Sequence, residues 1–258
     1  MGPTRRRFDV VISDIDGCLA PESARPFDTA AMARLADHNR RAVREGDVPV
    51  LTVCSGRPQP FAEAVCRITH NDWVPCIAEN GVWLYDPRDG TYHRDPAITG
   101  DDLRAVADAM SWVERELIPQ GFVVQPGKSA SISLFHPDTA RLRVLMPRLE
   151  EHFRARDWPF RVSMTVAWIN CDLHHVSKAT GVRRLMERAR LSRERAAGIG
   201  DMPSDLVMRE HVSFFACPAN AVEKVRRVAD YISPHEEIAG VLDILDRLSD
   251  PARARTGW

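Results

Sequence analysis

Short runs of apolar and β-branched residues alternate with helix-like patterns in the first part of the chain, and this alternation constrains the fold most. The predicted strands span residues 8–13, 48–54 and 76–78, and the predicted helices between them span residues 27–45 and 60–68. Strands that are apolar throughout and separated by helices are typical of a parallel sheet with helices on both faces. We therefore predict an α/β fold built on a parallel sheet.

The same alternation returns in the last third of the chain. The pattern there predicts strands over residues 197–200 and 213–216, and helices over 178–190, after Pro203, from near Asn220 and over 238–248. Residues 249–258, rich in Arg and Ala, are typical of a frayed tail. The two ends of the chain are thus predicted to build one sheet together.

The middle of the chain has a different order of elements. A hairpin over residues 82–93 with an Asp89-Gly90 turn precedes a helix at 101–117, strands at 122–125 and 129–135, a helix at 138–156, and strands at 160–165 and 167–173. The αββαββ order predicts a small α+β domain inserted into the α/β core. We place the core at residues 1–88 and 176–258 and the inserted domain at residues 89–175.

The charge balance argues against some classes of partner. The 258 residues include 35 Lys and Arg against 36 Asp and Glu, a formal net charge of −1, whereas nucleic-acid-binding domains usually carry a basic face. A polybasic membrane-surface protein is not expected either, and no apolar run approaches the roughly 20 residues that span a bilayer. We expect neither nucleic acid nor membrane as a partner, and a monomer or homodimer.

The six cysteines are spread along the chain without a C-x-x-C pair, which argues against a zinc site and against a disulfide-stapled domain. The basic run at residues 5–7 is followed by a short apolar stretch that Asp9 and Asp14 interrupt, so it does not resemble a secretory leader. We therefore expect free, buried or half-buried thiols in a reducing compartment, and a cytoplasmic location.

Polar side chains follow directly on several predicted strands. Asp14 and Asp16 follow the first strand, Ser55 the second, Asp201 a late one, and the third is followed by Glu79, Asn80 and Gly81. Because ligands of an open parallel sheet bind beyond the carboxyl ends of its strands, these residues are expected to converge at one edge. Several such residues at one edge indicate a ligand site more specifically than any one of them does alone.

The acidic members of this set, together with Asp205, predict a metal site. Asp14 and Asp16 alone are equally compatible with a turn cap, and a calcium loop is excluded because no ligand-spaced acidic residues follow. With Asp201 and Asp205 at the same edge, the carboxylates are expected to surround a hard dication such as Mg²⁺.

A second group of residues predicts an anion site. Ser55 and Gly56 precede a helix and offer a hydroxyl and backbone N–H groups, which suit a phosphate, although an ordinary helix N-cap would look the same. Arg57 is compatible with a phosphate contact or a surface ion pair. Lys178 stands in the first turn of a helix, where a cation opposes the helix dipole, so we expect it to face phosphate oxygens.

The predicted inserted domain offers fewer candidates. Trp168, Asn170 and Asp172 alternate along one strand and therefore share a face of its sheet. We expect one or two of them at most to touch a substrate.

Together, these residues resemble the four motifs of haloacid dehalogenase superfamily phosphatases in order and spacing. The motifs are Asp14-Ile15-Asp16-Gly17, Ser55-Gly56-Arg57, Lys178 and Gly200-Asp201-Met202-Pro203-Ser204-Asp205. The insertion looks like the large cap of the Cof-type (class IIB) branch, which includes phosphatases of sucrose phosphate and mannosylphosphoglycerate. Asn80-Gly81 is also similar to that branch, as is the stretch 217–221 before a predicted helix that ends at residues 229–232. The resemblance implies a Rossmann-like core and Mg²⁺-dependent hydrolysis of a small phosphorylated metabolite, most often a sugar phosphate.

The resemblance also implies catalytic roles. Asp14 would be the nucleophile that forms an aspartyl-phosphate, and Asp16 would protonate the leaving oxygen and then activate water. Ser55 and Lys178 would bind the phosphoryl group and stabilise its charge. The further substrate-binding residues would be Gly56, Arg57 and Asn80.

The implied metal site consists of Asp14, the backbone carbonyl of Asp16, and Asp201, with Asp205 as a further ligand or as a partner of the ligands. Two residues depart from the family pattern, because Cys18 replaces the usual Thr and Ser204 replaces the usual Asn. Both keep a small polar side chain, so we expect them to tune the site.

Two other functions are compatible with the same motifs. A phosphomutase resembling phosphomannomutase shares the architecture and the D-x-D-G start, but its fourth motif is usually longer. A non-catalytic phosphometabolite-binding protein would be expected to lack an acidic residue of the first or last motif, and none is missing here.

Overall fold

The chain folds around a five-stranded parallel sheet, as seen in a computed structural model that describes residues 6–22, 25–165 and 167–250. The strand order is β12-β11-β10-β1-β2. The strands are β1 (Val10–Ser13), β2 (Val50–Val53), β10 (Ala196–Ile199), β11 (Phe214–Cys217) and β12 (Tyr231–Ile232). Every residue of the first four is buried, which explains why they are apolar on both faces. The predicted α/β fold is confirmed.

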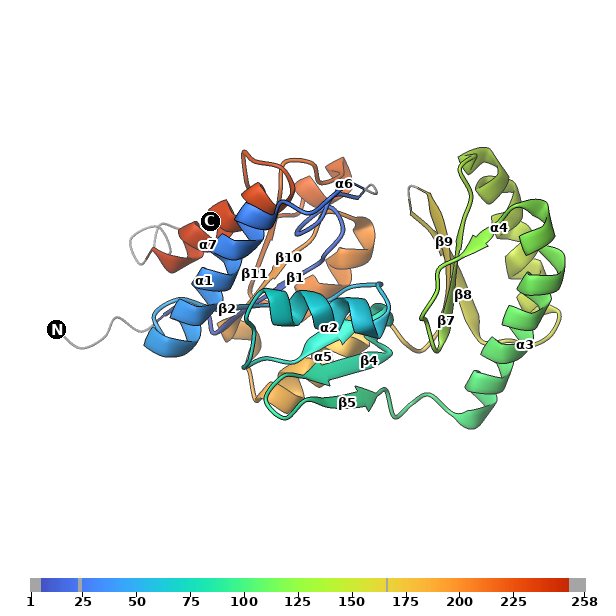
Figure 1. Cartoon of the computed structure of the whole chain (residues 1–258), viewed down its shortest axis with the longest axis horizontal. Coiled ribbons are helices and arrows are strands. Elements are labelled where there is room, and N and C mark those ends of the chain that lie inside the picture. The colour runs from blue at the N-terminus through green and yellow to red at the C-terminus, as the bar shows by residue number, and fades with distance from the viewer. Residues whose placement is uncertain (1–5, 23–24, 166, 251–258) are drawn as a thin grey trace.

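Helices cover both faces of this sheet (Figure 1). Alternate residues of β1 enter different clusters, since Val11 packs with one face and Val10 and Ile12 with the other. The first face is covered by α1 (Thr29–Glu45), α2 (Gln59–Ile68) and α7 (Glu237–Ser249), and the second by α5 (Lys178–Ala189), the 3-10 helix η4 (Pro203–Glu210) and α6 (Glu223–Arg226).

The third predicted strand, β3 (Cys76–Ala78), belongs to a separate three-stranded sheet and not to the five-stranded parallel sheet. A single parallel bridge joins its Ile77 to Cys54 after β2. Its ladder pairs antiparallel with the hairpin of β4 (Trp83–Asp86) and β5 (Thr91–Arg94). The predicted domain boundary between residues 88 and 89 therefore falls inside the turn of this hairpin. A division after Arg94 would keep the paired strands together, and we propose that boundary instead.

The inserted domain, which we call the cap, has the predicted αββαββ order. Its antiparallel sheet has the order β6-β7-β9-β8, and α3 and α4 lie on the side of the sheet that faces away from the core (Figure 1). The elements are α3 (Gly100–Glu116), β6 (Val123–Val124), β7 (Ser131–Phe135), α4 (Thr139–Arg154), β8 (Phe160–Met164) and β9 (Trp168–Leu173). The open face of the cap sheet is thus turned toward the core.

The helix predicted from near Asn220 through Ile232 is wrong in its second half. Its helical part, α6, is a single turn, and Tyr231–Ile232 forms the edge strand β12 beside β11. Most of the predicted C-terminal tail, residues 251–258, lies outside the described residues. All six cysteines are free and buried, as predicted. None of the described helices combines the length and apolarity that a bilayer crossing requires.

Candidate active site

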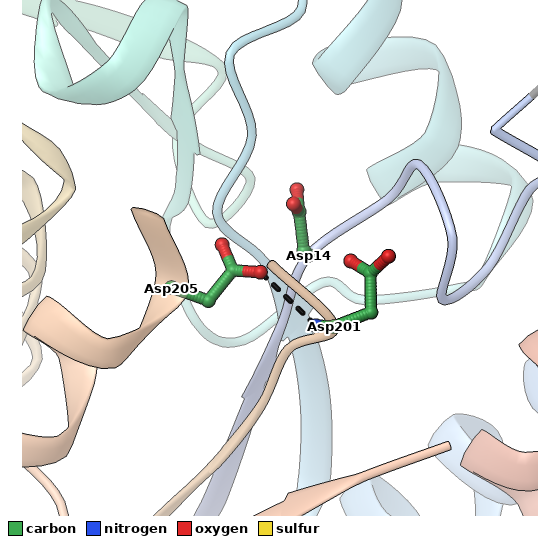
Figure 2. A group of neighbouring side chains, drawn as sticks. All are labelled: Asp14, Asp201 and Asp205. Carbon is green, nitrogen blue, oxygen red and sulfur yellow. Dashed lines mark hydrogen bonds between the residues drawn. The ribbon is translucent and has the colours of Figure 1, made fainter. Parts of the chain in front are cut away.

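Three of the predicted acidic residues meet at the carboxyl edge of the parallel sheet (Figure 2). Asp14 follows β1, Asp201 lies two residues after β10, and Asp205 lies in η4. One carboxylate oxygen from each lies within 4.8 Å of the other two, and all three residues are buried. Hard oxygen ligands at this spacing fit a divalent cation such as Mg²⁺.

Two glycines allow the close approach of these loops. Gly17 has a φ of +74°, and a Cβ atom there would lie 2.1 Å from Oδ2 of Asp201. A Cβ atom on Gly200 would lie 2.3 Å from that of Asp205. The Oδ2 of Asp205 accepts hydrogen bonds from the backbone N–H groups of Asp201 (3.1 Å; dashed in Figure 2) and Met202 (3.0 Å). The backbone therefore holds the orientation of the Asp205 carboxylate.

Lys178 lies among the carboxylates, at the start of α5. Its Nζ atom is 2.8 Å from Oδ2 of Asp14 and 2.7 Å from Oδ1 of Asp205. Ser177 caps the helix by accepting a hydrogen bond from the backbone N–H of Thr180, which places Lys178 at the first helical position. Although burial disfavours its charge, the charges of Asp14 and Asp205 raise the pKa of Lys178 well above its ordinary value. Lys178 therefore remains a cation beside Asp14.

Burial and mutual repulsion nevertheless disfavour the ionised form of Asp14 and Asp201. Burial, reinforced by the charge of Asp205, raises the pKa of Asp14 well above its ordinary value in spite of Lys178. Burial and the charges of Asp205 and Glu22 raise the pKa of Asp201 to about 8. One lysine is therefore insufficient to stabilise three ionised carboxylates here, and a bound dication would lower these pKa values.

Asp16 lies outside this carboxylate cluster because its side chain pairs with Arg57. Nε of Arg57 donates to Oδ2 of Asp16 at 2.8 Å, and Nη2 donates to Oδ1 at 2.5 Å. The ion pair is part-buried, so Arg57 is neither a simple surface residue nor, in this arrangement, free to bind phosphate. The contribution of the Asp16 backbone carbonyl to a metal site stays a prediction.

Ser55, Gly56 and Asn80 lie side by side. Ser55 Oγ accepts a hydrogen bond from the backbone N–H of Arg57 at 3.1 Å, whereas α2 begins only at Gln59, so the interpretation of Ser55 as an N-cap is wrong. Asn80 has a φ of +54°, and its Oδ1 would lie 3.1 Å from a Cβ atom on Gly56. Ser55 therefore offers a hydroxyl, and Gly56 offers a backbone without a Cβ atom, next to the Asn80 amide.

A cavity of about 620 Å³ joins these core residues to the cap. Asp14, Asp16 and Lys178 line it from the core, as do Ser55, Gly56, Arg57 and Asn80. Trp168, Asn170 and Asp172 line it from β9, so all three share the cavity, although we expected one or two at most to reach a substrate. The cap sheet therefore forms one wall of the site.

The sequence places Glu79 at this edge, but it does not show that Glu79 connects the core with the cap, and it gives no role to Lys128. Glu79 is buried, and its carboxylate accepts hydrogen bonds from the backbone N–H of Ser129 (2.8 Å) and of Ala130 (2.8 Å), and from the hydroxyls of Ser129 (2.9 Å) and Ser131 (3.0 Å). Lys128, next to these residues, lines the cavity. The rarity of lysine is a signal that could have identified Lys128, because the chain has three lysines among 35 basic residues.

Comparisons with known proteins agree with this architecture. A family model described as haloacid dehalogenase-like hydrolase matches residues 128–245. The fold is similar to that of Thermoplasma acidophilum 0175, with a TM-score of 0.71 at 21% identity, over 93% of this chain and 98% of that one. It is also similar to a haloacid dehalogenase-like hydrolase from Bacteroides thetaiotaomicron, with a TM-score of 0.70 at 16% identity, over 93% and 99% of the two chains.

Two relatives carry the name phosphoglycolate phosphatase. The one from Methanothrix thermoacetophila is 37% identical over 73 residues, which are 28% of this chain and 33% of that protein, so this chain spans about a third of the relative's length. The one from Methanospirillum hungatei is 25% identical over 239 residues, 91% and 94% of the two chains. The ordered motifs, the fold and the cap agree with these comparisons, and all of them support the resemblance to haloacid dehalogenase-like hydrolases of the Cof-type branch.

Proposed function

We propose that the protein is a Mg²⁺-dependent phosphomonoesterase that acts on a small phosphorylated metabolite through an aspartyl-phosphate intermediate. The observation that carries this proposal is the position of Asp14, a buried carboxylate that shares Lys178 with Asp205, lies close to Asp201 and lines a cavity between the core and the cap. Sugar phosphates are the substrates that the sequence resemblance favours. The names of the relatives add 2-phosphoglycolate as an early substrate to test.

The proposed first step uses Asp14 as the nucleophile. An oxygen of its carboxylate forms a bond to phosphorus while the bond from phosphorus to the ester oxygen breaks, and Asp16 donates a proton to that departing oxygen. In the second step the ionised Asp16 takes a proton from water, whose oxygen attacks the aspartyl-phosphate and releases phosphate. The phosphoryl oxygens are held by the Lys178 ammonium, the Ser55 hydroxyl, the backbone N–H of Gly56 and the side-chain amide of Asn80.

The residues of the site fit a bound dication. Asp14, Asp201 and Asp205, with the backbone carbonyl of Asp16, would hold Mg²⁺, which would supply positive charge against the phosphoryl oxygens. The raised pKa values of Asp14 and Asp201 support this proposal, because a cation relieves the repulsion that raises them. The cap would exclude water and select the leaving group. We also propose a cytoplasmic location and a monomer or homodimer.

The test is a screen of phosphate release from small phosphate esters, with Mg²⁺ and with EDTA, by the wild type and by Asp14→Asn. The proposal expects Mg²⁺-dependent release that the variant lowers by about 10³-fold or more. Phosphate release that is indifferent to EDTA, or equal in the variant, would refute the proposal. Isomerisation of a hexose phosphate without phosphate release would favour a mutase.

A further inference from the structure

The cavity is lined by four cationic side chains, and they differ in their ion pairs. Lys178 pairs with Asp14 and Asp205, and Arg57 pairs with Asp16. The third, Arg161, lies 3.9 Å from Asp172 and donates to two backbone carbonyls, of residues 174 and 176. The fourth, Lys128, has no carboxylate within 4 Å among the described residues. Its charge is therefore available to a ligand.

The surroundings of Lys128 favour an anionic ligand. Its Nζ atom donates to Oγ of Ser133 at 2.5 Å, and this hydroxyl in turn donates to Oδ1 of Asn170 at 2.5 Å. An ammonium has three N–H donors, so two remain for a ligand, and the Asn170 amide keeps its Nδ2 donors. Both Lys128 and Asn170 line the cavity. Burial lowers the pKa of Lys128, which means that its charge lacks full solvation and would gain from an anion.

The composition of the chain points to the same residue. The three lysines among the 35 Lys and Arg residues are Lys128, Lys178 and Lys224, and all the rest are arginine. Two of these three lysines line the cavity, while Lys224 is exposed on α6. Because lysine is a compact point charge and arginine a broad planar fork, a lysine suits a small group in a confined space.

The position of Lys128 relative to the core is held by Glu79. The backbone N–H groups of Ser129 and Ala130, directly after Lys128, both donate to the Glu79 carboxylate at 2.8 Å. Glu79 immediately precedes Asn80, which lies beside Gly56 in the proposed phosphate site. The loop that carries Lys128 is thus attached to the same short segment that helps to bind the phosphoryl group. This attachment sets the separation between the phosphate site and the Lys128 ammonium.

We propose that Lys128 and Asn170 bind a carboxylate on the leaving group, so that the substrate is a phosphate ester of a small hydroxy acid. This inference rests on the proposed function and adds the chemical class of the substrate. A monoanion fits better than a second phosphate, because the carboxylate of Glu79, which binds the backbone directly after Lys128, and that of Asp172, which lines the same cavity, would repel a dianion more strongly.

The experiment compares two pairs of phosphate esters. In each pair, one ester has a carboxylate where the other has a hydroxymethyl group. The pairs are 2-phosphoglycolate with 2-hydroxyethyl phosphate, and 3-phosphoglycerate with glycerol 1-phosphate. For the wild type, kcat/KM with Mg²⁺ should favour the carboxylate member of at least one pair by about tenfold or more, as for a charged hydrogen bond. Lys128→Met should remove most of that preference, mainly through KM, and Lys128→Arg should restore part of it. Lys224→Met is the matched control and should keep the wild-type preference, and thermal melting should show that all variants fold.

The outcomes separate this inference from the proposed function. Equal kcat/KM within both pairs, or an equal loss for both members of the preferred pair in Lys128→Met, would overturn the role of Lys128. If no ester, including p-nitrophenyl phosphate, is hydrolysed, the proposed function fails. The inference is then tested by calorimetric titration of the Mg²⁺-loaded protein with both pairs. Tighter binding of a carboxylate member that Lys128→Met abolishes would support it, and equal binding within both pairs would contradict it.

Discussion

The carboxylate of Asp16 and the guanidinium of Arg57 form a two-point ion pair at the wall of the cavity, with N–O distances of 2.8 and 2.5 Å. A bidentate pair fixes both the position and the orientation of a carboxylate. Arg57 therefore orients the residue that we propose as general acid and base. Its guanidinium also lies 5.0 Å from the ring centroid of Phe61, which limits its movement.

The pairing leads to a prediction for Arg57→Ala. If Arg57 acts by positioning Asp16, the variant should lower kcat for an alkyl phosphate by about 10- to 100-fold, and much less for p-nitrophenyl phosphate, whose leaving group needs no protonation. Steady-state kinetics with both substrates measure the difference. An equal loss with both would instead indicate that Arg57 binds the phosphoryl group directly.

Gly17→Ala should disrupt the metal site. An alanine there must adopt a positive φ and would place its Cβ atom 2.1 Å from Oδ2 of Asp201, so the Asp201 carboxylate has to move. Gly46→Ala is the matched control, because its φ is +69° but nothing lies within 4 Å of the added atom. Both variants should lose about 1 kcal/mol of stability through backbone strain. A Mg²⁺ titration of activity should show weakened activation in Gly17→Ala alone, and equal activation in both would contradict this account.

Glu79→Gln should loosen the attachment of the cap. The carboxylate accepts four hydrogen bonds from residues 129–131, and an amide would turn an N–H group toward at least one of these donors. We expect a loss of about 2–4 kcal/mol in the free energy of unfolding. Denaturant unfolding should show this loss, whereas Glu114→Gln, an exposed change on α3, should stay within about 0.5 kcal/mol of the wild type. Equal stabilities would contradict the role of Glu79.

The raised pKa of Asp201 predicts how stability depends on pH. Without a dication this pKa is about 8, against an ordinary value of 3.8, so between these values the folded chain keeps a proton that the unfolded chain has lost. The contribution to stability is present below about pH 4 and is lost as the pH rises through about 8. In the proposed site Mg²⁺ would bind the ionised carboxylate, so its stabilising effect should increase over the same window.

Calorimetric melting at about pH 5 and pH 8, in EDTA and in saturating MgCl₂, measures this effect. The increase in Tm on adding Mg²⁺ should be larger at the higher pH. Asp201→Asn should remove most of the difference between the two pH values. An increase that is independent of pH in the wild type would show that Asp201 is not coupled to the metal.

Much of the architecture could be predicted from local patterns. Fully apolar strands such as β1 and β2, separated by amphipathic helices, are compatible with few arrangements other than a covered parallel sheet. Once that sheet is assumed, Asp14 and Asp201 must meet because each follows the carboxyl end of a neighbouring central strand. The αββαββ order of the cap was predictable because its helices and longer strands have a clear hydrophobic period, and the two-residue β6 is marked by the Pro126-Gly127 turn that follows it.

The features that were missed depend on contacts between distant segments. The two-residue edge strand Tyr231–Ile232 is too short to show a period, so it was assigned to the preceding helix. Nothing in the residue types predicts that Asp16 pairs with Arg57 or that Glu79 binds the loop at residues 129–131, because long polar side chains choose partners by three-dimensional proximity. Lys128 was missed because its loop has no motif; the rarity of lysine distinguishes it in the sequence, but its role follows from its place in the cavity.

In the proposed mechanism, Asp14 carries the phosphoryl group during turnover. The most direct measurement is mass spectrometry of the full chain after a rapid acid quench of the reaction with substrate and Mg²⁺. The account predicts an added phosphoryl group on the peptide that contains Asp14, sensitive to hydroxylamine, absent with EDTA and absent in Asp14→Asn. Rapid Mg²⁺-dependent turnover by the wild type with the label on another residue, or the same label in Asp14→Asn, would contradict it.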